Sequence, residues 1–361
     1  MADQAPVNVD EFEALARERL PRPVYDYYAG GAGDEWTLRE NRAAYDRWVF
    51  LPRTLVDVSS VDTTTTVLGR PVSSPILVAP TAFQKLAHPE GELAMARGCL
   101  AADTTLVVST IATTSLEDVA ETGVSRWFQL YVQKDRPLTE EVVRRAEAAG
   151  YTALVVTVDA PFLGRRERDE RNNFSMPPEI HMANLRDLPV PTAEHGSSLQ
   201  LQFQLIDPSL SWDDIAWLES LSSLPLLVKG IMTPQDATHA LNAGCAGVIV
   251  SNHGGRQLDG AAATLDVLPA VADAVGDRGE VLVDGGVRRG QHALKALALG
   301  ARAVLVGRPA VWGLSADGER GVGAVLDMLK KEFSLALALA GTPNVGAITR
   351  DLLVRAAPAG P

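Results

Sequence analysis

Cysteine is scarce in this chain, with two residues among 361. Cys99 and Cys245 lie on apolar or turn-like stretches, and neither shows a CxxC or Cys/His spacing. This pattern argues against a disulfide framework and against a zinc site. We therefore expect no metal, and a reducing cytoplasmic location.

Long apolar runs are also missing. No uninterrupted run reaches the roughly 18 residues that indicate a membrane span. The N-terminal segment MADQAPVNVDEFEALARERL is acidic and amphipathic, whereas an export signal is basic and then apolar. We therefore expect a protein that is not exported and has no membrane partner.

Positive charge is in short supply. Lys and Arg number 33 against 45 Asp and Glu, which gives a formal net charge of -12. Nucleic-acid binding needs a broad basic surface, so this composition argues against nucleic acid as a partner. Any anionic ligand has to be bound by a local cluster of positive side chains.

Against these absences, eight short segments rich in Val, Ile and Leu recur along the chain. Their apolar residues are continuous rather than alternating, as in parallel strands that are covered on both faces. The segments are PILVAP from Pro75, TTLVVST from Thr104, RWFQLYV from Arg126, ALVVTVD from Ala153, LPLLVKG from Leu224, GVIVSN from Gly247, EVLVDGG from Glu280 and AVLVGR from Ala303.

Helical patterns separate most of these segments. EGELAMARGCLAA, TEEVVRRAEAAG, PQDATHALNAG and GQHALKALALG space their apolar residues by three and four, and glycine closes most of them. The repeat predicts an α/β fold, a (β/α)8 barrel over about residues 75–340, in one domain that spans residues 1–361. A doubly wound sheet is the alternative, but its usual GxGxxG fingerprint is absent.

Three regions fall outside the repeat. Residues 1 to about 74 form a predicted N-terminal helical extension, with a capping-box pattern at Asn8 and Glu11 and a helix from Asp34 to about Arg47. The connection after the fourth strand, about residues 160–223, is long enough for a lid or a disordered loop. The chain end, VRAAPAGP, suggests a disordered tail over about residues 355–361.

Polar residues follow each predicted strand, at the end where barrels of this class carry their active sites. Gln129, Thr157 and Lys229 lie within or at the end of apolar runs, where an unpaired polar group costs about a few kcal/mol. We therefore expect polar partners for them in the barrel mouth. The residues at these ends are Pro80, Thr81, Ala82, Ser109, Gln129, Tyr131, Thr157, Asp159, Lys229, Ser251, Asn252, His253, Asp284, Gly285, Gly307 and Arg308.

The last two strand ends are typical of a phosphate site. DGGVRRG (284–290) and GRP (307–309) place glycines and arginines at the starts of helices, where free N–H groups attract anions. The alternative is two ordinary turns whose arginines pair with acidic neighbours. SNHGGRQLDG (251–260) offers His253, and histidine as a residue type suits a base near neutral pH, because an unperturbed imidazole has a pKa of about 6.5. A purely structural histidine is the alternative there.

Together with VKGI, APTAFQKLAHPEGE, ALALGARAVLVGRP and VYDYYAGGAGDEWTLREN, these motifs resemble the FMN-dependent 2-hydroxy acid oxidase family, from about Glu11 to Leu353. The resemblance implies oxidation of a 2-hydroxy acid to the 2-oxo acid, with dioxygen reduced to hydrogen peroxide. It also implies FMN as cofactor and a homotetramer.

The same resemblance assigns roles to the positions that match. His253 would be the base and Asp159 its orienting partner. Arg256 and Arg166 would hold the substrate carboxylate, while Tyr27 and Tyr131 would bond the carboxylate and the hydroxyl. Residues expected to bind FMN are Pro80, Thr81, Ala82, Ser109, Gln129, Thr157, Lys229, Ser251, Asp284, Gly285, Gly286, Arg288, Gly307 and Arg308.

The substrate side chain is where the sequence departs from the short-chain members. Ile111 stands in STIATTS where glycolate oxidases typically carry tryptophan, and this smaller apolar wall leaves room for an aryl group. Mandelate or 4-hydroxymandelate is therefore the expected substrate, with lactate or another 2-hydroxy acid as alternative. A flavin-free barrel isomerase or aldolase that uses Lys229 is the competing class.

Overall fold

The computed structural model describes residues 5–185 and 204–356. In these ranges eight parallel strands close into a barrel in sequence order, and β11 returns to pair with β4. The predicted (β/α)8 barrel is confirmed, because each strand overlaps one predicted apolar segment. The strands are β4 (Ile76–Val78), β5 (Leu106–Ser109), β6 (Arg126–Leu130), β7 (Leu154–Thr157), β8 (Leu226–Ile231), β9 (Gly247–Val250), β10 (Glu280–Val283) and β11 (Ala303–Val306).

Alternation along each strand explains why the apolar runs are continuous. Leu77 points into a small core inside the barrel, whereas its neighbours Ile76 and Val78 point outward into the larger core beneath the helices. Leu282 is likewise internal, between outward-facing neighbours on β10. Both faces of every strand are thus buried, so apolar residues are continuous along it, and buried polar residues such as Gln129 and Lys229 occur only near the carboxyl ends.

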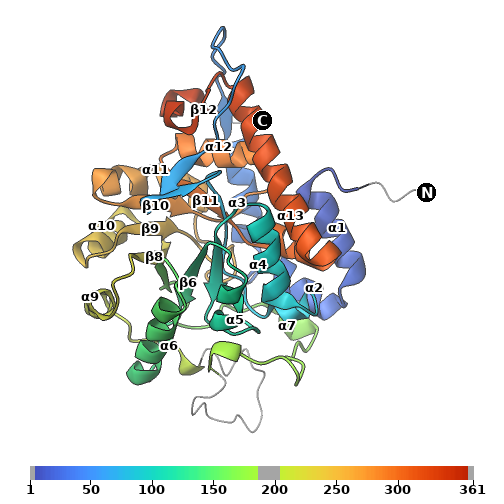
Figure 1. The fold of residues 1–361 in the computed structure, drawn as a ribbon, viewed down its shortest axis with the longest axis vertical. Coiled ribbons are helices and arrows are strands. Elements are labelled where there is room, and N and C mark those ends of the chain that lie inside the picture. Colours follow the sequence, from blue (N-terminus) through green and yellow to red (C-terminus); the bar gives the residue numbers. More distant parts are fainter. Residues whose placement is uncertain (1–4, 186–203, 357–361) are drawn as a thin grey trace.

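Helices surround the barrel, and α13 lies beside α4 and α1 (Figure 1). Gly150, Gly244 and Gly300 follow α6, α10 and α12 with φ of 74°, 95° and 107°, which confirms the glycine stops predicted there. The helices are α4 (Gly91–Ala101), α5 (Leu116–Glu121), α6 (Arg136–Ala148), α9 (Trp212–Leu221), α10 (Pro234–Asn242), α11 (Thr264–Val275), α12 (Gly290–Ala298) and α13 (Arg308–Leu339), with 3-10 turns η1 (Gln84–Leu86), η3 (Gly276–Arg278), η4 (Val345–Ala347) and η5 (Arg350–Leu352).

The N-terminal extension forms three helices, α1 (Val9–Arg19), α2 (Arg22–Ala29) and α3 (Trp36–Asp46). The predicted cap is present: Asn8 Oδ1 accepts from the Glu11 N–H at 2.9 Å, and the Glu11 carboxylate accepts from the Asn8 amide at 2.7 Å. The chain between α2 and α3 reaches the barrel mouth, where the Ala32 N–H donates to Gly255 O. The extension therefore helps to build the rim of the barrel.

Two strand pairs outside the barrel were not predicted. β2 (Thr65–Val67) and β3 (Arg70–Val72) form a hairpin whose Val67 joins the internal core. β1 (Trp48–Phe50) pairs antiparallel with β12 (Leu353–Arg355). The predicted disordered tail was therefore wrong at its start, because backbone pairing orders residues 354 and 355. Residues 357–361 of that tail lie outside the described residues.

The long connection after β7 contains more helix than predicted. It includes α7 (Glu167–Arg171), η2 (Ala183–Leu185) and α9, which is the barrel helix before β8. The prediction of a loop up to residue 223 was therefore wrong for residues 212–221. A capping box formed by Ser211 and Asp214 begins a helix there. Residues 186–203 of the predicted lid lie outside the described residues. Among the described helices, none is long and apolar enough to cross a membrane.

Candidate active site

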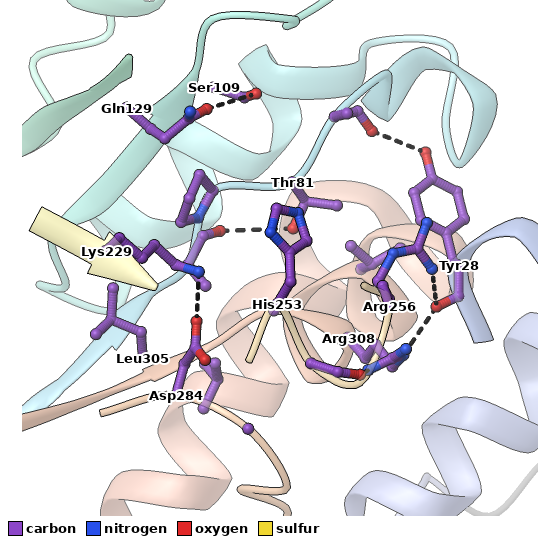
Figure 2. Close-up of a pocket in the computed structure, with 18 of the residues that line it drawn as sticks. Tyr28, Thr81, Ser109, Gln129, Lys229, His253, Arg256, Asp284, Leu305 and Arg308 are labelled. Atoms are coloured by element: carbon purple, nitrogen blue, oxygen red, sulfur yellow. Dashed lines mark hydrogen bonds and ion pairs between the residues drawn. The ribbon is translucent and has the colours of Figure 1, made fainter. Parts of the chain in front are cut away.

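A pocket opens at the carboxyl ends of the barrel strands, and predicted residues from all eight strand ends meet in it (Figure 2). All predicted site residues line the pocket except Asp159 and Ser251, which lie behind it and bond to residues that do. Pro80, Thr81, Ala82, Thr157 and Gly307 are among the predicted residues that line the pocket.

His253 lines the pocket and pairs with Asp159, which lies behind it. His253 Nδ1 lies 2.8 Å from Asp159 Oδ1, and its Nε2 lies 3.5 Å from the Tyr131 hydroxyl. Burial raises the pKa of Asp159, but His253 and then Lys229 lower it by more than burial raises it. The pKa of Asp159 therefore lies below its ordinary value. The ionised carboxylate favours a proton on Nδ1, which leaves Nε2 as the acceptor that faces the pocket.

The turn that carries His253 is unusual. Its φ is 58°, a left-handed conformation that few residues other than glycine adopt. Gly254 and Gly255 continue the turn at φ of 65° and 74°. A Cβ at Gly255 would lie 2.6 Å from the backbone nitrogen of Leu38, so only glycine permits this close approach to α3.

Lys229 is a buried cation with a buried counter-charge. Its Nζ lies 2.8 Å from Asp284 Oδ2 and donates to Ser251 Oγ at 2.8 Å (Figure 2). Burial lowers the pKa of Lys229, but Asp284 and Asp159 outweigh it and raise the pKa above its ordinary value. The ammonium therefore stays charged beside the pocket, as its position in an apolar strand required.

Arg166 differs from every other arginine in the run GRRERDER. Arg165, Arg168 and Arg171 form ion pairs with nearby acids, and their side chains are 36–73% exposed. Arg166 is 7% exposed and lines the pocket, and none of the described residues forms an ion pair with it. Burial and then Arg256 lower its pKa to about 10. This buried charge lacks an anion.

Arg256 and Arg308 are bound by the same carbonyl groups at the end of α2. Gly30 O accepts from Arg256 Nη1 at 3.0 Å and from Arg308 Nη2 at 2.8 Å. Tyr28 O accepts from Arg308 Nε at 2.8 Å (Figure 2). The Arg256 guanidinium lies over the Tyr27 ring at 5.1 Å. Neither arginine has an acidic partner within ion-pair distance among the described residues, although several donors of Arg308 are already bound to carbonyls.

The turn after β10 brings Arg288 into the pocket as well. Gly285 and Gly286 have φ of 96° and 78°, and a Cβ at Gly286 would lie 1.9 Å from Asn41 O. Arg288 is 8% exposed, and burial lowers its pKa. Within residues 5–185 and 204–356 no acid lies within ion-pair distance of Arg288, which disfavours the alternative of arginines paired with acidic neighbours here, whereas Arg289 does pair with Glu332 at 2.8 Å.

Several pocket residues were missed by the sequence reasoning. Tyr28 is buried, lines the pocket and donates its hydroxyl to Phe83 O at 2.8 Å. It belongs to the motif VYDYYAGG, so its position was visible but its contacts were not. The others are mostly backbone or apolar contacts that no chemical pattern marks: Ala79, Gly254, Val287, Leu305, Val306, Pro309 and Val311.

A barrel whose mouth holds a histidine–carboxylate pair, together with arginines that have no acidic partner in the described part of the chain, defines an enzyme that acts on anionic ligands. The model of the FMN-dependent dehydrogenase family matches residues 16–355. The chain is 52% identical to an L-lactate oxidase of Nostoc sp., over 98% of this chain and 99% of that protein. It is 51% identical to a glycolate oxidase of Spinacia oleracea, over 95% and 94% of the two chains.

Solved structures of a mandelate oxidase are similar as well. One that contains (S)-4-hydroxymandelic acid has a TM-score of 0.92 and 42% identity, and the match covers 97% of this chain and 98% of that chain. The chain therefore belongs to the FMN-dependent dehydrogenase family, and FMN is its cofactor. It is an FMN-dependent 2-hydroxy acid oxidase, which removes the flavin-free isomerase or aldolase as an alternative.

The residues present fit this cofactor. Gln129 is 1% exposed and its Nε2 has no partner among the described residues, although its Oε1 accepts from Ser109 Oγ at 3.1 Å. Asp284 Oδ1 and Arg288 Nε are buried and equally unpaired there. Buried polar atoms are rarely left without partners, so these atoms suit a ligand with a polar ring edge, hydroxyls and a phosphate.

Proposed function

We propose that this enzyme oxidises mandelate or 4-hydroxymandelate to the corresponding 2-oxo acid, with dioxygen reduced to hydrogen peroxide. The main support is the geometry around His253, which has Asp159 at 2.8 Å on one ring nitrogen and the pocket on the other. Arg166 and Arg256 lie within the same pocket as the free side of this ring. A proton acceptor and a carboxylate site are thus available to one small ligand.

FMN would lie across the barrel mouth. When bound, it supplies the two-electron acceptor that oxidation of the hydroxyl carbon requires. The charged Lys229 beside the ring would favour the negative charge of the reduced form. In this proposal the backbone of Pro80, Thr81 and Ala82 contacts the ring; Ser109, Gln129, Thr157, Lys229 and Ser251 serve its polar edge; Asp284 bonds the ribityl hydroxyls; and Gly285, Gly286, Arg288, Gly307 and Arg308 hold the phosphate.

His253 would accept a proton from the substrate at Nε2. Asp159 would hold the imidazole in the required tautomer and stabilise the imidazolium that forms. The Tyr131 hydroxyl, 3.5 Å from Nε2, would bond the substrate hydroxyl next to the proton that leaves. Burial raises the pKa of Tyr131, so this hydroxyl stays protonated and can donate.

The substrate carboxylate would bind Arg166 and Arg256, with the Tyr27 hydroxyl as a further donor. Burial raises the pKa of Tyr27, so its hydroxyl is neutral. Binding a carboxylate here supplies the anion that Arg166 lacks, and a charge-assisted bond is worth about 1.5–3 kcal/mol. Orientation by this clamp would point the hydroxyl carbon of the substrate toward His253.

Ile111 favours an aryl side chain. It lines the pocket at 4% exposure, and its carbonyl accepts from the Phe83 N–H, which fixes the wall that it forms. This preference is also supported by the similarity of the chain, at 42% identity, to a mandelate oxidase whose structure contains (S)-4-hydroxymandelic acid. Lactate is the second candidate, because the curated relative at 52% identity is an L-lactate oxidase.

Anaerobic titration tests the proposal. Mandelate, 4-hydroxymandelate, lactate and glycolate are each added to the oxygen-free enzyme, the flavin absorbance is followed, and air is then admitted. We expect the mandelates to bleach the flavin at the lowest concentrations, and air to restore the colour with one hydrogen peroxide formed per oxidised substrate. Bleaching by lactate at much lower concentrations than by mandelate would reverse the substrate assignment.

Arg256→Met tests the carboxylate clamp separately. We expect this variant to raise KM for the hydroxy acid chiefly, since the lost charge serves binding. An unchanged KM would exclude Arg256 from the clamp.

A homotetramer and a cytoplasmic location, both expected from the sequence, remain part of the proposal. Light scattering of the purified enzyme tests the tetramer.

A further inference from the structure

His292 is a buried histidine outside the proposed proton transfer. It lies in the first turn of α12, directly after the glycine turn that ends β10. Its ring stacks on Tyr45 of α3, with centroids 4.3 Å apart and planes at 11°. This histidine does not line the pocket, yet it packs against the backbone of a turn that does.

One hydrogen bond joins the His292 ring to that turn, because its Nδ1 accepts from the Arg288 N–H at 3.2 Å. The Tyr45 hydroxyl donates to Gly285 O at 3.3 Å from the same side. Thr264 Oγ1, which donates to Asp284 O, and Glu332, which accepts from the Gly290 N–H at 2.8 Å, hold the two ends of the same segment. The ring therefore acts as a brace between α12 and the turn.

This brace requires a neutral imidazole. An imidazolium has no lone pair on Nδ1 and could not accept from the Arg288 N–H. Burial and then Lys295, whose Nζ donates to Tyr45 O at 2.8 Å, lower the pKa of His292 to about 3. Arg288 and Arg42 act in the same direction. Burial and the surrounding cations thus keep the imidazole neutral, which is the form that accepts a hydrogen bond at Nδ1.

We propose that His292 is a positioning residue for the cofactor phosphate: it fixes the backbone of residues 286–288 so that the Arg288 guanidinium points into the pocket. The inference rests on the proposed role of this turn in binding the phosphate of FMN. His292 touches neither the cofactor nor the substrate and acts only through Arg288. Its loss should therefore weaken binding of the phosphate and spare binding of the flavin ring.

Riboflavin separates these two contributions, since it is FMN without the phosphate. Full-length wild type, His292→Leu, His292→Asn and Arg288→Met are stripped of flavin, and the Kd for FMN and for riboflavin is measured by flavin fluorescence. His292→Leu leaves the buried Arg288 N–H unpaired, so we expect FMN binding about tenfold weaker and riboflavin binding nearly unchanged. Asparagine carries an acceptor near the position of Nδ1, and His292→Asn should restore most of the loss.

The outcomes separate the claims. Arg288→Met should lower the affinity for FMN toward that for riboflavin; an equal loss for both flavins would show that the turn does not bind the phosphate, and the proposed phosphate site would fall together with the role of His292. If Arg288→Met is selective but His292→Leu binds FMN as wild type does, only the brace is wrong. An equal loss for both flavins in His292→Leu also overturns it, because that result indicates general damage. Amide exchange of the apoprotein should rise at Arg288 in His292→Leu and not in His292→Asn.

Discussion

Arg166 combines a cost in stability with a function, and both should appear when it is replaced. Burial lowers the pKa of Arg166 from 12.5 to about 10, which corresponds to a destabilisation on the order of 3 kcal/mol while the side chain is charged. A cation whose folded-state pKa is depressed destabilises the protein at every pH below that pKa. The cost is thus fully present at neutral pH and is relieved only as pH rises through about 10.

Arg166→Met removes this buried charge and keeps most of the apolar contacts. We expect the Tm of the substrate-free enzyme to rise by a few degrees, less the loss from imperfect packing. The same change deletes a charge-assisted bond to the substrate carboxylate, so kcat/KM for mandelate should fall by about ten- to a hundredfold. A variant that is more stable but less active cannot be explained by misfolding.

Arg165→Met is the matched control. Arg165 is adjacent in sequence, but its side chain is 69% exposed and pairs with Glu170 at 3.0 Å, so both Tm and kcat/KM should change little. The assays are thermal unfolding followed by flavin release, and steady-state kinetics at matched FMN occupancy. A normal kcat/KM in Arg166→Met, or an equal loss in Arg165→Met, would refute the reasoning.

Three further changes test other parts of the pocket. His253→Gln should keep the flavin colour but lose anaerobic bleaching, whereas His239→Gln on α10 should behave as wild type; bleaching at a comparable rate in His253→Gln means that another group is the base. Ile111→Trp should lower kcat/KM for mandelate by about tenfold or more and spare glycolate, because the indole fills the space for the aryl ring; equal losses for both acids would contradict this. Gly286→Ala should be isolated without FMN, since the new Cβ would lie 1.9 Å from Asn41 O, and wild-type FMN content would show that the turn can move.

The barrel was predictable because its signal is local and repeated. Each strand is buried on both faces, so segments such as ALVVTVD show continuous apolar residues whatever their neighbours are. The pairing of β1 with β12 was not predictable in this way. Each of these strands has three residues, and they lie about 300 residues apart in the chain, so neither contains a periodic pattern. The same limit explains why residues 354 and 355 looked like part of a tail.

The sequence likewise showed which types of side chain lie in the site. The fold decided how deeply each one is buried, whether it is charged and which residues it contacts. The order of strand ends gives His253, Lys229 and Asp284 as residues of one barrel mouth. The resemblance selects Arg166 from its run, but only tertiary structure shows the physical difference from Arg165: just before α7, Arg166 is 7% exposed, whereas Arg165 is 69% exposed and pairs with Glu170. Only tertiary structure brings His292 against the Arg288 backbone, since hydrogen bonds and burial arise between segments that the sequence alone does not place together.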